Sequence, residues 1–157
     1  MTYKIAGLPR DLFKPLFGLD DHQLTSHNAM RVVADNDGGY PCRITLEDAK
    51  VGESLLLLNH VSLDGRTPFR TAYAIFVRET EREAPLFKDC IPPSLEGRAL
   101  ALRCFDGGGL LVSAELCEPG RVDDSIRRLF GRRDIDEIHA HNPVYGCFLA
   151  RIERDER

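Results

Sequence analysis

Two histidines and a cysteine near the C-terminus form the tightest group of reactive side chains in the sequence. They belong to the segment IHAHNPVYGCF (138–148), in which His139 and His141 occupy alternate positions and Cys147 follows a predicted turn. Histidine nitrogen and cysteine sulfur are common zinc ligands, and a histidine beside a cysteine can also activate the thiol as a nucleophile. The segment therefore raises two chemical hypotheses, which compete with a purely structural role.

The alternation of apolar residues predicts that this segment is a β-hairpin. Between residues 136 and 152, apolar side chains favour the even positions and polar side chains the odd ones, as in two half-buried strands. If both strands face one core, even positions pair with even positions, and the loop contains an odd number of residues. The register that follows places His141 opposite Cys147, His139 opposite Leu149, and Glu137 opposite Arg151.

In that register the Cβ atoms of paired residues lie roughly 4.5–5.5 Å apart, so an imidazole can approach a thiol. One hypothesis is that His139, His141 and Cys147 bind a divalent transition metal such as zinc. The other is that Cys147 is a nucleophile whose thiolate is favoured by His141, while Asn142 or Glu137 orients an imidazole. We rank zinc above the thiol, because nothing near Cys147 in the sequence supplies a further positive group, and a structural role above both.

Other polar residues could complete such a site, although the sequence does not place them relative to the hairpin. We treat them as candidate ligand-binding residues. They are Cys42 and Arg43 in YPCR, Asn59 and His60 at the end of a leucine-rich strand, Arg70 and Tyr73 near the next strand, and Asn142 after the second histidine.

The chain as a whole predicts a single α+β domain over residues 1–157, with a mainly antiparallel β-sheet, open or barrel-like, and a few short helices. Ser54–His60 is nearly continuous leucine and too short for a typical helix, which predicts a strand buried on both faces inside the sheet. Asp20 and Gln23 form a predicted capping box for a brief helix. The clearest helix is 122–131, and further strands are predicted at 3–6, 30–35, 73–79, 98–105 and 110–117.

The second predicted hairpin, 98–117, also has a predicted register. If Cys104 shares a face with Val112 and Ala114, the loop must again be odd in length. Residues Asp106–Gly108 supply a three-residue loop with glycine available for a left-handed position.

Composition narrows the classes of partner. The formal net charge of −4 and the pI near 5.7 argue against nucleic-acid binding and leave a small molecule or another protein as the expected partner. The longest apolar run, Leu55–Leu58, is far below membrane-spanning length, and MTYKIAGLPRDLF lacks the apolar core of a signal peptide, so we expect a cytoplasmic protein. Five cysteines without a CxxC pair predict reduced thiols, with Cys90, Cys104 and Cys117 as small buried residues.

Four different motifs lie at separated places along the chain. They are GYPCRITLEDA, GESLLLLN, AIFVRE, and IHAHN with GC five residues after His141. Together they resemble a small bacterial family known as domain of unknown function 1203. The resemblance covers the chain nearly from end to end, and the combination is more specific than any single motif. The family has no established activity, so the resemblance implies a bacterial single-domain protein and supplies no catalytic residues.

Motifs of common enzyme superfamilies are missing from the sequence, including HExxH, the P-loop, a dinucleotide fingerprint after a strand, and a serine nucleophile elbow. We therefore expect a small binding or structural module that uses the polar face of the hairpin. The alternative is a small enzyme that uses His139, His141 and Cys147. A cleft in which reactive groups converge favours the enzyme, whereas a shallow, exposed face favours the binding module.

Overall fold

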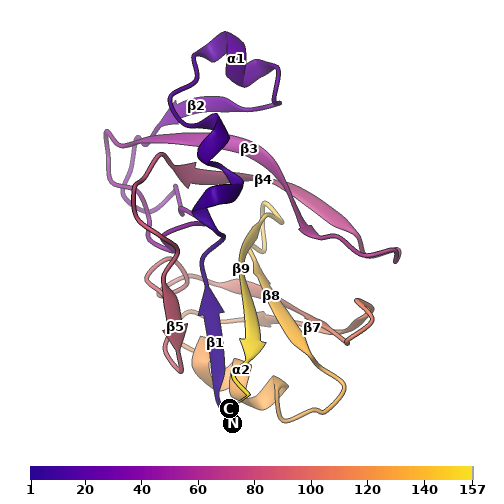
Figure 1. The fold of residues 1–157 in the computed structure, drawn as a ribbon. Coiled ribbons are helices and arrows are strands. Elements are labelled where there is room, and N and C mark those ends of the chain that lie inside the picture. The colour runs from indigo at the N-terminus through magenta and orange to yellow at the C-terminus, as the bar shows by residue number, and fades with distance from the viewer. Residues whose placement is uncertain (157) are drawn as a thin grey trace.

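Two β-sheets, one lying across the other, form the framework of the fold (Figure 1). The structure is a computed structural model, and it describes residues 1–156. The larger sheet has six strands in the order β5-β1-β9-β8-β6-β7, and the smaller sheet has three in the order β2-β3-β4. The strands of the larger sheet are β1 (Tyr3–Ala6), β5 (Leu86–Lys88), β6 (Leu100–Phe105), β7 (Leu111–Cys117), β8 (Glu137–His141) and β9 (Phe148–Arg154). Those of the smaller sheet are β2 (Met30–Val33), β3 (Ser54–Leu63) and β4 (Thr71–Arg78).

The helices are few and short. They are the 3₁₀ helices η1 (Arg10–Leu12) and η2 (Lys14–Leu16) and the α-helices α1 (Asp21–Thr25) and α2 (Val122–Leu129). Strands β7 and β8 both pair with β6, so α2, which lies within the helix predicted at 122–131, carries the chain across β6. The mainly antiparallel architecture is confirmed, while both sheets end in edge strands and are open rather than barrel-like. None of the helices within residues 1–156 is long and apolar enough to cross a membrane.

Buried apolar side chains form two large clusters and a small third one made of Ala34, Ala49 and Leu55. The first large cluster lies between the larger sheet and α2 and contains Ile126 and Ile138. The second packs the N-terminal short helices against the smaller sheet and contains Leu56. The chain passes from one cluster to the other between Ile44 and Leu46, which belong to the second and the first cluster respectively. The segment before β3 therefore ties the two sheets together.

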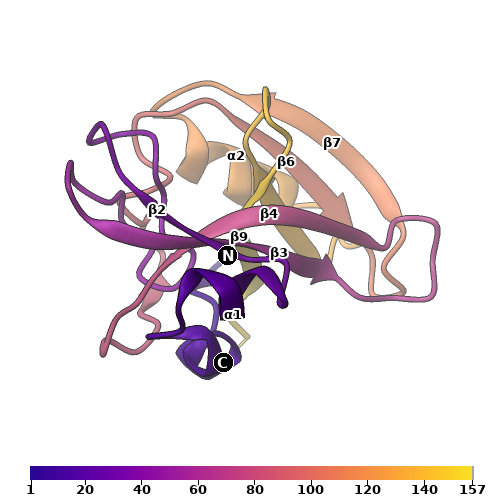
Figure 2. The same ribbon diagram turned by 90° about the horizontal axis from the view of Figure 1, so that it is seen from above.

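Strand β3 occupies the centre of the smaller sheet, as predicted, and Figure 2 shows it running beside β4. It pairs with β2 on one side and with β4 on the other. The side chains of Leu55 and Leu56 point to opposite faces of the sheet, and both are fully buried. The leucine run thus forms an interior strand, which continues to Leu63 rather than ending at His60.

The predicted capping box begins α1. Oδ1 of Asp20 accepts a hydrogen bond from the backbone N–H of Gln23 at 2.8 Å, and Oε1 of Gln23 accepts one from the backbone N–H of Asp20 at 3.0 Å. The helix has only five residues, so these two bonds satisfy a large share of the backbone N–H groups that have no partner inside the helix.

We expect Asp20→Ala to lower the free energy of unfolding by about 1 kcal/mol, because the first turn of α1 loses its side-chain acceptor. Urea denaturation followed by circular dichroism measures this loss. Asp11→Ala, which changes an exposed aspartate within η1, is the matched control and should cost less than about 0.5 kcal/mol. Equal losses in both variants would show that the cap does not stabilise the protein.

The β6–β7 hairpin has a different register from the predicted one. Cys104 pairs with Ser113, an odd position, and a β-bulge follows at Phe105. The carboxylate of Asp106 accepts two backbone N–H hydrogen bonds inside the turn and so stabilises a longer connection. The prediction of a three-residue loop was wrong because the bulge shifts the pairing by one residue, which leaves the side chain of Leu116 72% exposed.

All five cysteines lie in the described part of the chain and are free. Cys104 and Cys117 are buried as predicted, and burial raises the pKa of the Cys104 thiol to about 11. The prediction that Cys90 is buried was wrong, because it lies in the exposed turn after the edge strand β5. Cys147 is half-buried.

Candidate functional site

A β-bulge changes the register of the β8–β9 hairpin. Even positions pair with even positions along most of its length, as predicted, but the strands are offset by two residues from the predicted register. The bulge after Ala140 then places His141 opposite Phe148, so the predicted pairing of His141 with Cys147 is wrong. Cys147 lies in the loop between the strands. The other pairs are Glu137–Glu153, Ile138–Ile152, His139–Arg151 and Ala140–Ala150.

His139 and His141 lie on the face of β8 that meets the smaller sheet, and both are fully buried. Nε2 of His139 lies 3.2 Å from a carboxylate oxygen of Glu137. Glu137 also forms an ion pair with Arg151, but across a diagonal of the sheet rather than directly opposite it as predicted. Nδ1 of His141 lies 2.9 Å from the carbonyl oxygen of Gly146, so this nitrogen carries the proton and donates it. The opposite ring nitrogens, Nδ1 of His139 and Nε2 of His141, have no hydrogen-bond partner within residues 1–156.

Burial keeps His141 neutral near pH 7. It lowers the pKa of His141 to about 4, and the nearby cations of Arg103 and Arg43 act in the same direction, while the hydrogen bond to the Gly146 carbonyl opposes them. The imidazole therefore holds the loop that carries Cys147 through a neutral N–H donor. The activated-thiol hypothesis required a hydrogen bond between the His141 imidazole and the Cys147 thiol. Nδ1 of His141 does not form that bond, because it donates to the Gly146 carbonyl.

Aromatic rings connect the two sheets beneath this loop. The ring of Phe148 lies 5.4 Å from that of His139, 5.9 Å from that of His141 and 6.3 Å from that of His60, measured between ring centroids. Tyr73, which is paired with His60 in the smaller sheet, packs edge-on against His141 at 5.2 Å. Burial lowers the pKa of His60. The sheets thus meet through histidines and aromatic residues.

The thiol of Cys147 contacts Arg43, which precedes it by 104 positions in the sequence. Nη2 of Arg43 donates to the sulfur at 3.3 Å, while Nε donates to the carbonyl oxygen of Phe148 at 2.8 Å and Nη1 to that of Pro41 at 2.6 Å. The arginine is only 1% exposed, and no carboxylate of the described residues lies within ion-pair distance of it. Burial lowers the pKa of Arg43, and interaction with Cys147 opposes that shift. The thiol is thus the contacting group that can carry a compensating negative charge.

Arg43 and Cys147 line a cleft of about 580 Å³, within the range of small-molecule sites. Tyr40 and Phe76, whose rings pack 5.0 Å apart, form part of one wall, and Tyr145 in the β8–β9 loop stands at the mouth. In the part of the chain that the structure describes, no aspartate or glutamate lines the cleft. The cleft is therefore lined by two arginines and several aromatic side chains.

The cations around the cleft differ in how they are compensated. Arg98, which also lines it, binds both carboxylate oxygens of Asp48, at 2.7 and 2.8 Å. Nη1 of Arg103 donates to the hydroxyl oxygen of Tyr73 at 2.9 Å, and interactions with Thr71 and Arg103 lower the pKa of Tyr73. Arg98 is paired with a carboxylate, whereas Arg43 has no carboxylate partner among the described residues.

Asn142 lines the cleft and also fixes the loop. Its Oδ1 accepts hydrogen bonds from the backbone N–H groups of Val144 and Tyr145, both at 2.9 Å. Its own backbone N–H donates to the carbonyl oxygen of Cys147, also at 2.9 Å. Gly146 completes the turn with a φ of 78°, which a side chain would strain. Asn142 and Gly146 therefore set the loop conformation together with the His141 hydrogen bond to the Gly146 carbonyl.

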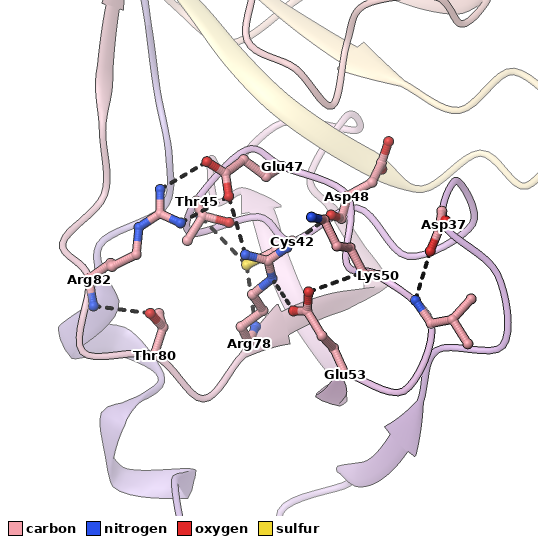
Figure 3. A network of polar contacts seen from close by, with 11 residues as sticks. Asp37, Cys42, Thr45, Glu47, Asp48, Lys50, Glu53, Arg78, Thr80 and Arg82 are labelled. Carbon is pink, nitrogen blue, oxygen red and sulfur yellow. Dashed lines mark hydrogen bonds and ion pairs between the residues drawn. The ribbon is translucent and has the colours of Figure 1, made fainter.

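Cys42 belongs to a structural polar network rather than to the cleft (Figure 3). Its sulfur accepts hydrogen bonds from the backbone N–H groups of Arg78 at 3.3 Å and Thr45 at 3.5 Å. Arg78 bridges Glu47 at 3.2 Å and Glu53 at 3.1 Å, so the network holds β4 against the preceding loop. Two other candidates also lie away from the cleft: Asn59 is exposed on β3, and Arg70 pairs with exposed Asp64.

The three predicted zinc ligands are not assembled. Among residues 1–156, no three histidine, cysteine, aspartate or glutamate side chains are arranged to hold a metal ion. The reason is the register, because the bulge and loop turn the sulfur of Cys147 toward Arg43 and leave Nδ1 of His141 bonded to the Gly146 carbonyl.

A second hollow, of about 700 Å³, lies beside the β6–β7 turn and the end of β9. It contains charges of both signs, and several of them pair with one another. Arg151 binds Glu137 and Glu153, and Lys4 lies 3.8 Å from Glu153. This hollow therefore offers a weaker case for a site than the cleft does.

A protein-family model matches residues 39–154 and is described as "Protein of unknown function (DUF1203)". The chain belongs to this family. The resemblance noted from the separated motifs is thereby confirmed, and Arg43, Tyr73, Asn142 and Cys147 all lie in the matched region. No curated protein and no solved structure matches the chain.

In this DUF1203 chain, four of the residues singled out from the sequence meet at the cleft, namely Arg43, Tyr73, Asn142 and Cys147. Tyr40 and Arg98 were not predicted. Tyr40 opens the same YPCR motif as Arg43, so the motif could have indicated it. Arg98 comes from the turn before β6, where no local pattern distinguishes it from a surface arginine.

Proposed function

We propose that this protein is a small-molecule-binding module, and that its ligand lies in the cleft with an anionic group, such as a carboxylate, beside Arg43. The proposal is supported by the size of the cleft and by its lining of aromatic side chains and two arginines. The aromatic wall formed by Tyr40 and Phe76 suits a planar apolar group attached to the anion.

The observation that carries the proposal is the buried guanidinium of Arg43. Removing an ion from water costs several kcal/mol unless an opposite charge compensates it. The described residues offer this guanidinium two carbonyl oxygens and a thiol. These contacts use three of the five N–H donors of an arginine, so two remain for a ligand. Arginine presents such paired donors to carboxylates in a bidentate manner.

We expect benzoate to bind about tenfold more tightly than benzamide, because the two probes have the same shape and only benzoate carries a charge for Arg43. Calorimetric titration at low ionic strength measures the two affinities, since salt screens the contact. Arg43→Gln should abolish the preference, and Arg70→Gln, which removes a cation on a surface loop, should retain it.

Equal affinity of the wild type for benzoate and benzamide would contradict the anionic class of ligand. Failure of a panel of small aliphatic and aromatic carboxylates to bind at all would contradict the binding module itself. Loss of the preference in both arginine variants would point to net charge rather than to the cleft.

We propose further that the chain works as one domain of residues 1–157 in a reducing cytoplasm, without nucleic acid as a partner. Five free cysteines support the reducing compartment. A net charge of −4 opposes binding to a phosphate backbone. Catalysis by Cys147 is the second candidate function, and the observation that favours it is its contact with Arg43.

A further inference from the structure

The surroundings of Cys147 differ from those of the other four cysteines. Cys42 is bonded to backbone N–H groups, Cys104 and Cys117 are buried in the core beside α2, and Cys90 is exposed. Cys147 is half-buried at the cleft, with its sulfur 3.3 Å from a guanidinium nitrogen.

The cleft beside Cys147 also contains a buried cation, the guanidinium of Arg43. Arg43 is 1% exposed, lines the cleft, and is without a carboxylate partner in the chain as far as Glu156. A cation beside a cysteine favours the thiolate, and a thiolate compensates a cation that has been removed from water. Each charge therefore stabilises the other.

We propose that Cys147 is a nucleophilic thiolate paired with Arg43, and that it reacts with hydroperoxides that enter the cleft. This reaction goes beyond the binding of an anion and does not require it. His141 acts as a positioning residue, because its Nδ1 donates to the carbonyl oxygen of Gly146 and so fixes the backbone from which the thiol projects.

In the reaction, the thiolate sulfur attacks the terminal oxygen of R–O–OH. A sulfur–oxygen bond forms, the oxygen–oxygen bond breaks, and its electron pair leaves with the alkoxide, which then takes a proton from water. Sulfur is oxidised to a sulfenic acid and the hydroperoxide is reduced to an alcohol, or to water when the probe is hydrogen peroxide. Arg43 stabilises negative charge on the sulfur and, through its remaining N–H groups, on the departing oxygen.

The first test uses the reduced wild-type protein without any ligand. It is treated with hydrogen peroxide at pH 7, the sulfenic acid is trapped with dimedone, and each cysteine is quantified by peptide mass spectrometry. We expect Cys147 to react about tenfold faster than Cys90, although Cys90 is more exposed. If Cys147 reacts no faster than Cys90, it is an ordinary thiol and the proposal is overturned.

The second test assigns the effect to Arg43. Arg43→Gln should slow the reaction of Cys147 about tenfold, Arg43→Lys should retain most of the rate, and Cys90 should be unchanged in both variants. Buried Cys104 reports on unfolding, since it should react only when the protein opens. An unchanged rate at Cys147 in a folded Arg43→Gln variant would overturn the pairing.

Saturating benzoate separates this proposal from the proposed function. If an anion and the sulfur share Arg43, benzoate should slow the oxidation of Cys147 severalfold and leave that of Cys90 unchanged. Rapid oxidation of Cys147 without any effect of benzoate would refute anion binding beside Arg43 and support the thiolate. Slow oxidation in a protein that binds benzoate would do the reverse.

Discussion

Acidification from pH 7.5 to pH 5 is expected to reduce the free energy of unfolding by about 2 kcal/mol through His141 alone. Burial lowers the pKa of this residue in the folded protein to about 4, whereas the pKa of an unfolded histidine is about 6.5. Between these values the unfolded chain binds a proton that the folded chain does not bind. The stabilisation is therefore complete above about pH 6.5 and decreases as the pH falls toward 4.

Urea denaturation at both pH values, in wild type and in His141→Asn, isolates this contribution. Asparagine keeps a nitrogen donor near the position of Nδ1 and removes the titration, so the variant should lose less stability on acidification. His60, whose pKa burial also lowers, contributes equally to both proteins. His27→Asn, at an exposed histidine, should keep the pH dependence of the wild type. An unchanged pH dependence in His141→Asn would assign the titration to another group.

Phe148→Ala is expected to lower the free energy of unfolding by about 3–5 kcal/mol, the range typical of buried aromatic residues. Phe148 is 2% exposed and packs against three histidine rings at the junction of the two sheets. Removal of its ring leaves a cavity at the place where the sheets meet. For a chain of this size the loss corresponds to a decrease in melting temperature of roughly 10 °C or more, which calorimetry measures directly.

Two variants serve as controls for this prediction. Tyr145→Ala removes a ring of similar size from the neighbouring loop, but this tyrosine is 84% exposed, so the change should lie within about 0.5 kcal/mol. Phe148→Leu keeps much of the apolar volume and should cost less than about 1.5 kcal/mol. A loss below about 1 kcal/mol in Phe148→Ala would mean that the ring does not hold the sheets together.

The elements of the fold could be predicted where their causes are local. The leucine run of β3, the Asp20 capping box of α1 and the stripe of α2 each depend on residues within a few positions of one another. The registers of both hairpins could not be predicted from alternation, because each contains a bulge. In each turn one side chain, that of Asp106 or Asn142, binds backbone N–H groups and stabilises a longer connection than parity alone suggests.

The site could be predicted only in part, for a related reason. Tyr73, Asn142 and Cys147 were chosen for their chemistry, but the neighbour that decides what Cys147 can do is 104 positions away. The absence of a cation near Cys147 in the sequence favoured zinc over the thiol. The fold supplies the missing cation, because the segment between the two large core clusters brings the guanidinium of Arg43 to the sulfur.

The place of β1 in the larger sheet has a consequence for the order in which the protein can assemble during synthesis. The strand lies between β5 and β9, so among the nine described strands the one synthesised first pairs with the one synthesised last (Figure 1). Strands β2, β3 and β4 are consecutive in sequence and can pair earlier. Contacts between distant parts of a chain slow folding, to milliseconds or longer in proteins dominated by such pairings. A nascent chain therefore holds Arg43 without its thiol partner until β9 has emerged.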